Sequence, residues 1–293
     1  MARFLQYALT GLSAGSLYAL VALGIVLIYR STRVLNFAHG DVATLGTFVA
    51  FALVSQGYSF SVAFAVAILV GAALSVAFYF GVLIPAQRQG ATLLGQVILT
   101  LGLALVFQGV IVYQWGAEPD RLPFPLSDSK TWKLGPVFIS ELSLGTFAVG
   151  LVGSLLLYLL VQKTRLGLAM RATSENLPAA QTLGIPTRMV LSVSWAVASV
   201  LGVVAGVFLA AALFLDPFFM LDPFLKGFAA AVLGGLNSLP GAVLGGLILG
   251  VAESLTGGFL TIHFKNTLAF VIIIVVLLVR PEGLLGHEFK ERV

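Results

Sequence analysis

Long apolar segments with almost no charge follow one another along nearly the whole chain. Only 10% of the 293 residues are charged and 59% are hydrophobic, whereas a soluble domain carries about 25% charged residues. The chain is therefore predicted to be a polytopic membrane protein without a separate soluble domain. We expect an all-α transmembrane bundle that forms one domain over residues 1–293, with about eight or nine spans.

The expected spans differ in length. Segment 227–236 is too short to cross a bilayer, so we expect it to pack against segment 241–255 inside the protein. Segment 5–29 is too long for the core of a signal peptide and lacks an Ala-x-Ala cleavage site, so we interpret it as the first span. Glycines spaced four apart, such as Gly246 and Gly250, predict close helix contacts. The remaining expected spans are 36–54, 59–83, 93–113, 142–161, 191–213 and 264–279.

Charge predicts the orientation. Loop 162–190 carries four basic residues and one acid, Glu175. Because Lys and Arg favour the cytoplasmic side, we expect this loop and the tail after Arg280 to face the cytoplasm. Loop 115–141 has mixed charges and four prolines, which break helices, so we expect it outside, together with the N-terminus.

The basic loop contains the signals of a short helix. Asn176 is a favourable N-cap, and Pro178 fits the first turn. Ala179 and Ala180 are small helix formers, and Gly184 fits the left-handed position that ends a helix. A capped helix that faces the cytoplasm predicts a docking surface, with a plain connector between spans as the alternative.

Enzyme signatures are missing from the sequence. It has no P-loop, no HExxH motif and no cysteine, which excludes disulfides and thiolate metal sites. No basic cluster with interleaved aromatic residues suggests nucleic-acid binding. We therefore predict no catalytic residues, no cofactor and no bound metal.

Polar side chains inside the expected spans are the candidates for a solute pathway. Such groups are costly in hydrocarbon and usually face a cavity. The ionisable Asp41 and Glu253 are the strongest, with a wetted position near a span end as the alternative. Gln96 and Gln108 are more typical of hydrogen bonds between helices. The candidate pathway residues are Tyr18, Asn36, His39, Asp41, Asn237 and Glu253.

Several motifs resemble the Liv-type permease family, the membrane subunits of branched-chain amino acid ABC importers. The most specific are NFAHGD, with Asp41 where the family commonly has Glu, and RPEGLLG near the end. TLGLALVFQG, MRATSENLPAAQTLGI and LKGFAAAVLGGLNSLPGAVLGGLILGVAESL extend the resemblance over nearly the whole chain. The length is similar to that of the shorter of the two permeases.

This resemblance implies a partnership in a bacterial inner membrane. A second permease, giving a heterodimer, would complete the pathway, two cytoplasmic ATP-binding subunits would drive it, and a periplasmic binding protein would deliver the solute. ENLPAAQTLGI resembles the family's coupling motif. It implies that the ATPase-coupling residues are Arg171, Glu175, Asn176, Ala179, Ala180 and Gly184.

The solute remains open at this point, because similar permeases carry urea, short amides or aromatic acids. An ATP-independent secondary transporter is a further alternative. That class usually places several charges in mid-span for ion coupling, and most spans here have none.

Overall fold

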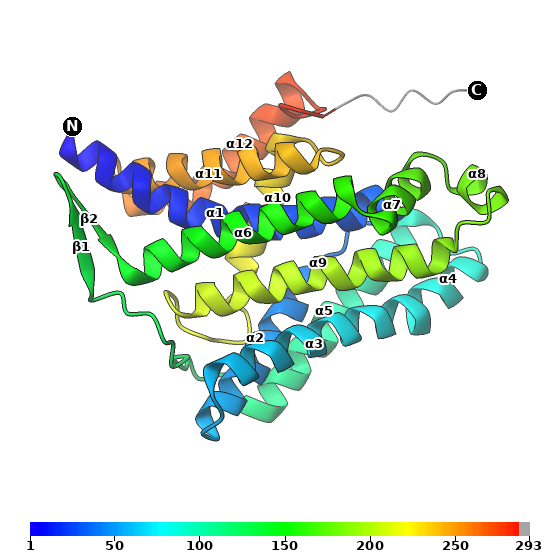
Figure 1. The fold of residues 1–293 in the computed structure, drawn as a ribbon, viewed down its shortest axis with the longest axis horizontal. Coiled ribbons are helices and arrows are strands. Elements are labelled where there is room, and N and C mark those ends of the chain that lie inside the picture. Colours follow the sequence, from blue (N-terminus) through cyan, green and yellow to red (C-terminus); the bar gives the residue numbers. More distant parts are fainter. Residues whose placement is uncertain (287–293) are drawn as a thin grey trace. The chain divides into compact units, whose positions relative to one another are not determined.

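The computed structural model describes residues 1–286 of the chain, excluding the side chains of Leu134, Ile262, His263, Lys265 and Asn266. The remainder of the predicted cytoplasmic tail, 287–293, lies outside the described residues. The fold is mostly helical, as predicted (Figure 1). Its elements are α1 (Ala2–Thr32), α2 (His39–Ser55), α3 (Phe60–Phe78), the π-helical η1 (Tyr79–Leu83), α4 (Ile84–Arg88), α5 (Leu93–Trp115), β1 (Thr131–Leu134), β2 (Val137–Ser140), α6 (Glu141–Lys163), α7 (Arg165–Glu175), α8 (Leu177–Thr182), α9 (Thr187–Ala210), α10 (Leu221–Gly234), α11 (Leu239–Phe259) and α12 (Ile262–Val279).

Six helical segments of the described residues are long and apolar enough to cross a membrane. The predicted pair of short segments is corrected in one respect, because α11 has 21 residues and is one of the six, whereas α10 has only 14. The apolar helices at His39–Ser55 and Thr267–Val279 are shorter. The six are Ala2–Thr32, Phe60–Arg88, Leu93–Trp115, Glu141–Lys163, Thr187–Ala210 and Leu239–Phe259.

The chain forms two compact units. The first comprises Met1–Val26, Leu126–Ser154 and the chain from Asp222 onward. The second comprises Leu27–Pro125 and Leu155–Leu221. Helices α1 and α6 therefore begin in the first unit and end in the second.

Glycines let α1, α10 and α11 approach closely within the first unit. A Cβ atom at Gly250 of α11 would overlap the backbone of Gly11 and Gly15 on α1. A Cβ atom at Gly245 would likewise overlap Ala230 of α10. The predicted glycine faces are thus helix contacts, of the kind that replaces hydrophobic burial as the packing force in membranes.

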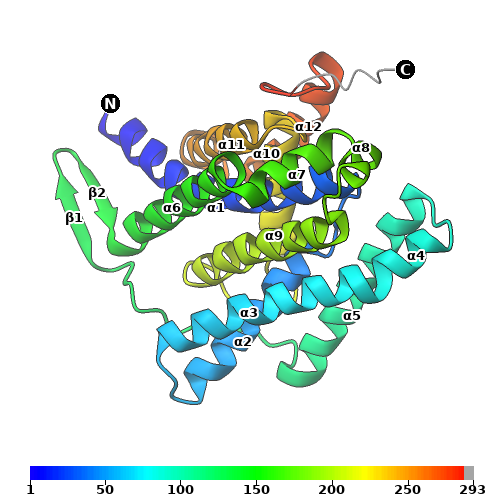
Figure 2. The ribbon, with the colours of Figure 1, turned by 45° about the vertical axis from the view of Figure 1, so that its right-hand side comes forward.

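The second unit is built on α2, α3 and α9, which lie side by side in both ribbon views (Figures 1 and 2). Val203 of α9 fits against Gly46 of α2 and Gly71 of α3, where a Cβ would collide with its side chain. Trp195 of α9 is fully buried, with its ring beside Phe78 and Tyr79. Gly46 and Gly71 therefore make room for Val203, whereas Trp195 packs beside aromatic rings.

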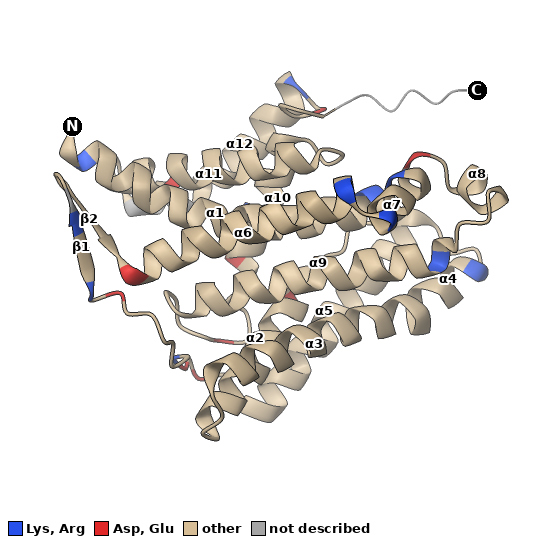
Figure 3. Ribbon diagram, in the orientation of Figure 1, with Lys and Arg blue, Asp and Glu red and all other residues tan. Residues whose placement is uncertain are grey.

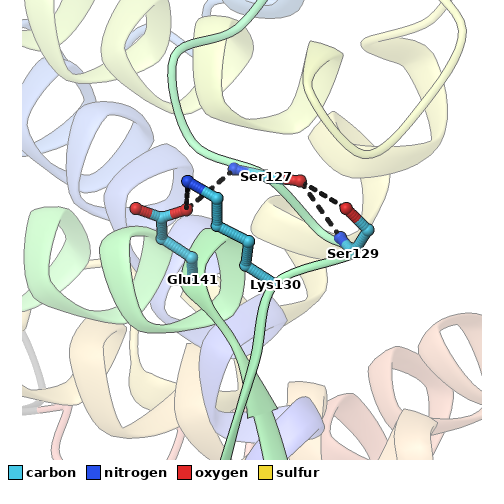
Figure 4. Close-up of polar contacts among 4 residues, drawn as sticks. All are labelled: Ser127, Ser129, Lys130 and Glu141. Atoms are coloured by element: carbon cyan, nitrogen blue, oxygen red, sulfur yellow. Dashed lines mark hydrogen bonds and ion pairs between the residues drawn. The ribbon is translucent and has the colours of Figure 1, made fainter.

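A β-hairpin, which the sequence analysis did not predict, lies in loop 115–141. Strands β1 and β2 pair antiparallel, with Thr131 opposite Ser140. The side chain of Gln6 on α1 donates a hydrogen bond to the Phe138 carbonyl at 2.7 Å and accepts one from the Phe138 N–H at 2.9 Å. At the hairpin's base, Lys130 forms an ion pair with Glu141 at 3.8 Å (Figure 4).

Candidate functional site

A buried ion cluster joins α10 to α11 in the first unit. The Lys226 ammonium lies 2.6 Å from Glu253 Oε1 and also 2.6 Å from Asp222 Oδ2. Tyr18 of α1 interacts with Glu253, and its ring centroid is 5.7 Å from the Lys226 ammonium. One cation thus contacts two carboxylates beside a phenol.

Helical spacing places these side chains together. Tyr18 follows Gly15 by three residues and Glu253 follows Gly250 by three, so each lies on the glycine face where α1 and α11 meet. Lys226 follows Asp222 by one turn of α10, the spacing that favours an ion pair along a helix. The close helix contacts therefore position the charges.

The structure brings together two of the predicted pathway residues, Tyr18 and Glu253, and adds Lys226, which the sequence analysis missed. A lone lysine inside a glycine-rich apolar segment was the available signal, because such a charge needs a partner in lipid. Asn237 lies in the turn between α10 and α11, beside Gly286.

The other predicted pathway residues belong to the NFAHGD bend of the second unit. Asn36 is buried, and its Oδ1 accepts a hydrogen bond from the Ala38 N–H at 3.1 Å. The hydroxyl group of Thr100 on α5 accepts a bond from the Phe37 N–H at 3.2 Å. These bonds hold the bend that precedes α2.

Two ionisable side chains follow this bend. His39 is buried against Gly202 of α9, and neither ring nitrogen has a hydrogen-bond partner among the described residues. Asp41 accepts a bond from Gln108 Nε2 of α5 at 2.7 Å. Gln96 of α5 accepts a hydrogen bond from Gln87 of α4 at 2.8 Å. Gln96 and Gln108 thus form the bonds between helices that were predicted for them.

The short helix α8 has the caps that the sequence predicts. Asn176 Oδ1 accepts a bond from the Ala179 N–H at 2.9 Å, and Pro178 lies in the first turn. Gly184 has a φ of 79°, the left-handed conformation expected after the last turn. The sequence analysis missed α7, which Thr164 caps by accepting a bond from the Gly167 N–H at 2.9 Å.

The exposed face of α8 differs from the expected one. Ala180 is only 2% exposed, because its methyl group packs inside the chain. The prediction that Ala180 lies on the exposed docking face of α8 is therefore wrong. Leu177 and Leu183, at 40% and 80% exposed, and the exposed Ala179 present the free side instead. Two large apolar side chains thus lie on the exposed side of the segment for which a small-residue face was predicted.

Basic residues surround this helix within the second unit. In Figure 3 they gather at the ends of α4 and α6, along α7 and at the start of α9. Arg171 Nη1 donates to Gln162 Oε1 at 3.0 Å. Glu175, just before α8, lies close enough to Arg30 of α1 for their charges to attract.

Similarity to known proteins decides the family. Residues 7–278 match the family described as branched-chain amino acid transport system / permease component. The chain belongs to this family. The permease is 33% identical to LivH of Salmonella typhimurium, a high-affinity branched-chain amino acid transport system permease protein, over 99% of this chain and 98% of the relative.

Other relatives match the permease over most of its length. BraD of Pseudomonas aeruginosa, which has the same description as LivH, is 32% identical over 99% of this chain and 98% of its own. An autoinducer 2 import system permease protein, LsrC of Salmonella paratyphi B, is 27% identical over 80% and 65% of the two chains. The permease is thus a membrane-embedded subunit related to importers of different solutes.

Proposed function

We propose that this permease forms, with a second permease subunit, the translocation pathway of an ABC importer for branched-chain or related amino acids. The observation that carries the proposal is the similarity to LivH and BraD over 99% of the chain. Two cytoplasmic ATP-binding subunits supply the energy, and a periplasmic binding protein delivers the solute. The permease itself catalyses no reaction.

The proposed topology has nine passages through a bacterial inner membrane, because an odd number is needed to place the N-terminus outside and the tail after Arg280 in the cytoplasm. To the six long apolar segments it adds α2, α12 and the short α10 together with its non-helical flanks. The basic loop at 162–190 then faces the cytoplasm and the hairpin loop at 115–141 faces the periplasm, because Lys and Arg concentrate on the cytoplasmic side.

The proposed coupling element is α8 with its flanks. Its exposed Leu177 and Leu183 would enter an apolar groove of an ATP-binding subunit. Glu175 would link α8 to α1 through Arg30, since the two charges attract each other. Arg171, Asn176 and Gly184 would hold the loop in the docking conformation, and Ala179 would permit close approach.

The proposed pathway residues fall in both units. Tyr18, Asn237 and Glu253 would contribute from the first unit, and Asn36, His39 and Asp41 from the second. Transient contacts suffice for transport, because the binding protein supplies affinity and the pathway must release the solute.

The test is co-purification of the permease with the products of neighbouring genes, followed by an ATPase assay with and without binding protein. We expect a stable complex whose ATP hydrolysis rises when binding protein loaded with leucine is added. A panel of urea, short amides and aromatic acids distinguishes the alternative solutes. A permease that purifies alone and transports along an ion gradient would refute the proposal.

A further inference from the structure

The two carboxylates that contact Lys226 differ in exposure. The Glu253 side chain is 3% exposed and the Lys226 side chain 5%, whereas the Asp222 side chain is 53% exposed. Glu253 is therefore the buried partner of the lysine. Asp222 is the member of the cluster that a molecule from outside the protein can reach.

The charges of the cluster are unequal. Lys226 carries one positive charge, and Asp222 and Glu253 each carry one negative charge when ionised. Glu253 alone neutralises Lys226, which a buried ion requires. The bond from Lys226 to Asp222 is therefore not needed for neutrality and can be exchanged for another partner.

The cluster also lies at an unusual position for a charge. Helix α10 has 14 residues and is about 21 Å long at 1.5 Å per residue. The helix alone is too short to cross the hydrocarbon core, which is about 30 Å thick, so the non-helical residues beside it must lie at membrane depth. Non-helical backbone at membrane depth is tolerated where protein surrounds it or where it lines a water-filled cavity. Asp222 lies in the first turn of α10, directly after a non-helical stretch, and its exposed carboxylate suits a position that lines a water-filled cavity.

We propose that Asp222 and Lys226 together receive the charged ends of a passing zwitterionic amino acid, an inference that rests on the proposed function. The substrate carboxylate pairs with the Lys226 ammonium in place of Asp222. The released Asp222 carboxylate pairs with the substrate ammonium. Glu253 stays bonded to Lys226 at 2.6 Å.

This exchange keeps every charge paired. Two new ion pairs replace one, and no bare ion is left in a region of low dielectric constant, where it would be costly. The substrate's side chain takes no part, so the contact suits a family of amino acids rather than one member. Urea or a short amide offers only a neutral carbonyl to Lys226 and a neutral N–H to Asp222, so it would form hydrogen bonds there but no ion pairs.

The test is uptake of labelled leucine into proteoliposomes that hold the complete importer, with binding protein outside and ATP inside. Asp222→Asn removes the charge but keeps the size. We expect its initial uptake rate to fall about tenfold or more, because a hydrogen bond to a charged group contributes at least that factor. Subunit retention and binding-protein affinity for leucine should stay at the parental level.

Asp216→Asn is the matched control. Asp216 also precedes a proline, and its carboxylate accepts a bond from the Phe218 N–H at 2.8 Å, which asparagine can accept as well. It should take up leucine at the parental rate. Asp222→Glu should recover part of the lost uptake because it restores the carboxylate.

Parental uptake by Asp222→Asn would overturn the inference and leave the proposed function intact. Loss of subunit retention in that variant would also overturn it, by assigning Asp222 to packing. If the parental complex itself takes up no amino acid, the proposed function fails and the inference fails with it.

Discussion

Replacing Lys226 by methionine should destabilise the first unit more than any change to its carboxylate partners. Methionine keeps the length of the side chain but removes the charge. The Glu253 carboxylate, 3% exposed, is then left buried without its cation. Breaking a buried ion pair from one side costs about 3–5 kcal/mol.

Glu253→Gln should cost less, about 1.5–3 kcal/mol. It leaves Lys226 paired with Asp222 at 2.6 Å, so no buried charge is isolated. In the double variant, Lys226→Met with Glu253→Gln, neither buried charge remains. Its cost should therefore be smaller than the sum of the two single costs by about 1–3 kcal/mol, the range for residues in direct contact.

The assay is unfolding of the purified permease in mixed micelles, followed by tryptophan fluorescence. Lys130→Met is the control, because Lys130 and Glu141 form an exposed pair in the same unit, with side chains 76% and 33% exposed at 3.8 Å (Figure 4). Such pairs contribute about 0–1 kcal/mol. Equal costs for Lys226→Met and Lys130→Met, or strict additivity in the double variant, would refute the assignment of a buried ion pair.

Three further outcomes are expected. Gly184→Val strains a backbone φ of 79°, and Leu183→Asp places a charge on an 80% exposed position. Each variant should retain about tenfold less of the ATP-binding subunits in pull-down assays. Full retention in both would contradict docking through α8. An impermeant thiol reagent added to intact spheroplasts should label Ser129→Cys and spare Ser174→Cys, and the opposite pattern would reverse the topology. Asp41→Asn keeps a carbonyl oxygen for the bond from Gln108 Nε2 but removes the negative charge. It should lower leucine uptake about tenfold and leave the affinity of the binding protein for leucine unchanged. Uptake at the parental rate would show that the Asp41 charge is not needed in the pathway.

Local signals were sufficient for some features. The cap at Asn176 and the left-handed Gly184 depend on residues within one short segment, so the sequence predicted both. Glycines spaced four apart predicted close helix contacts, because close backbone approach requires small residues on one face; which helices meet there, α1 and α11, comes from the structure.

Features that depend on distant contacts were missed or misplaced. Lys226 was overlooked because its buried partner Glu253 lies 27 positions away on another helix, although the exposed partner Asp222 lies only one turn before it. Helix α11 extends to Phe259, beyond the predicted end at 255, where Gly258 packs against the ring of Tyr7. Ala180 has a small side chain whichever way it faces, and only the packing of the loop shows that it is buried.

Accumulation of labelled leucine in proteoliposomes tests the proposed function most directly. Vesicles would contain this permease with or without its partner permease and the ATP-binding subunits, and with ATP or a non-hydrolysable analogue inside. We predict accumulation against a gradient only when all subunits, binding protein and hydrolysable ATP are present. Accumulation by the permease alone, driven by an ion gradient and indifferent to ATP, would contradict its assignment as the membrane subunit of an ABC importer.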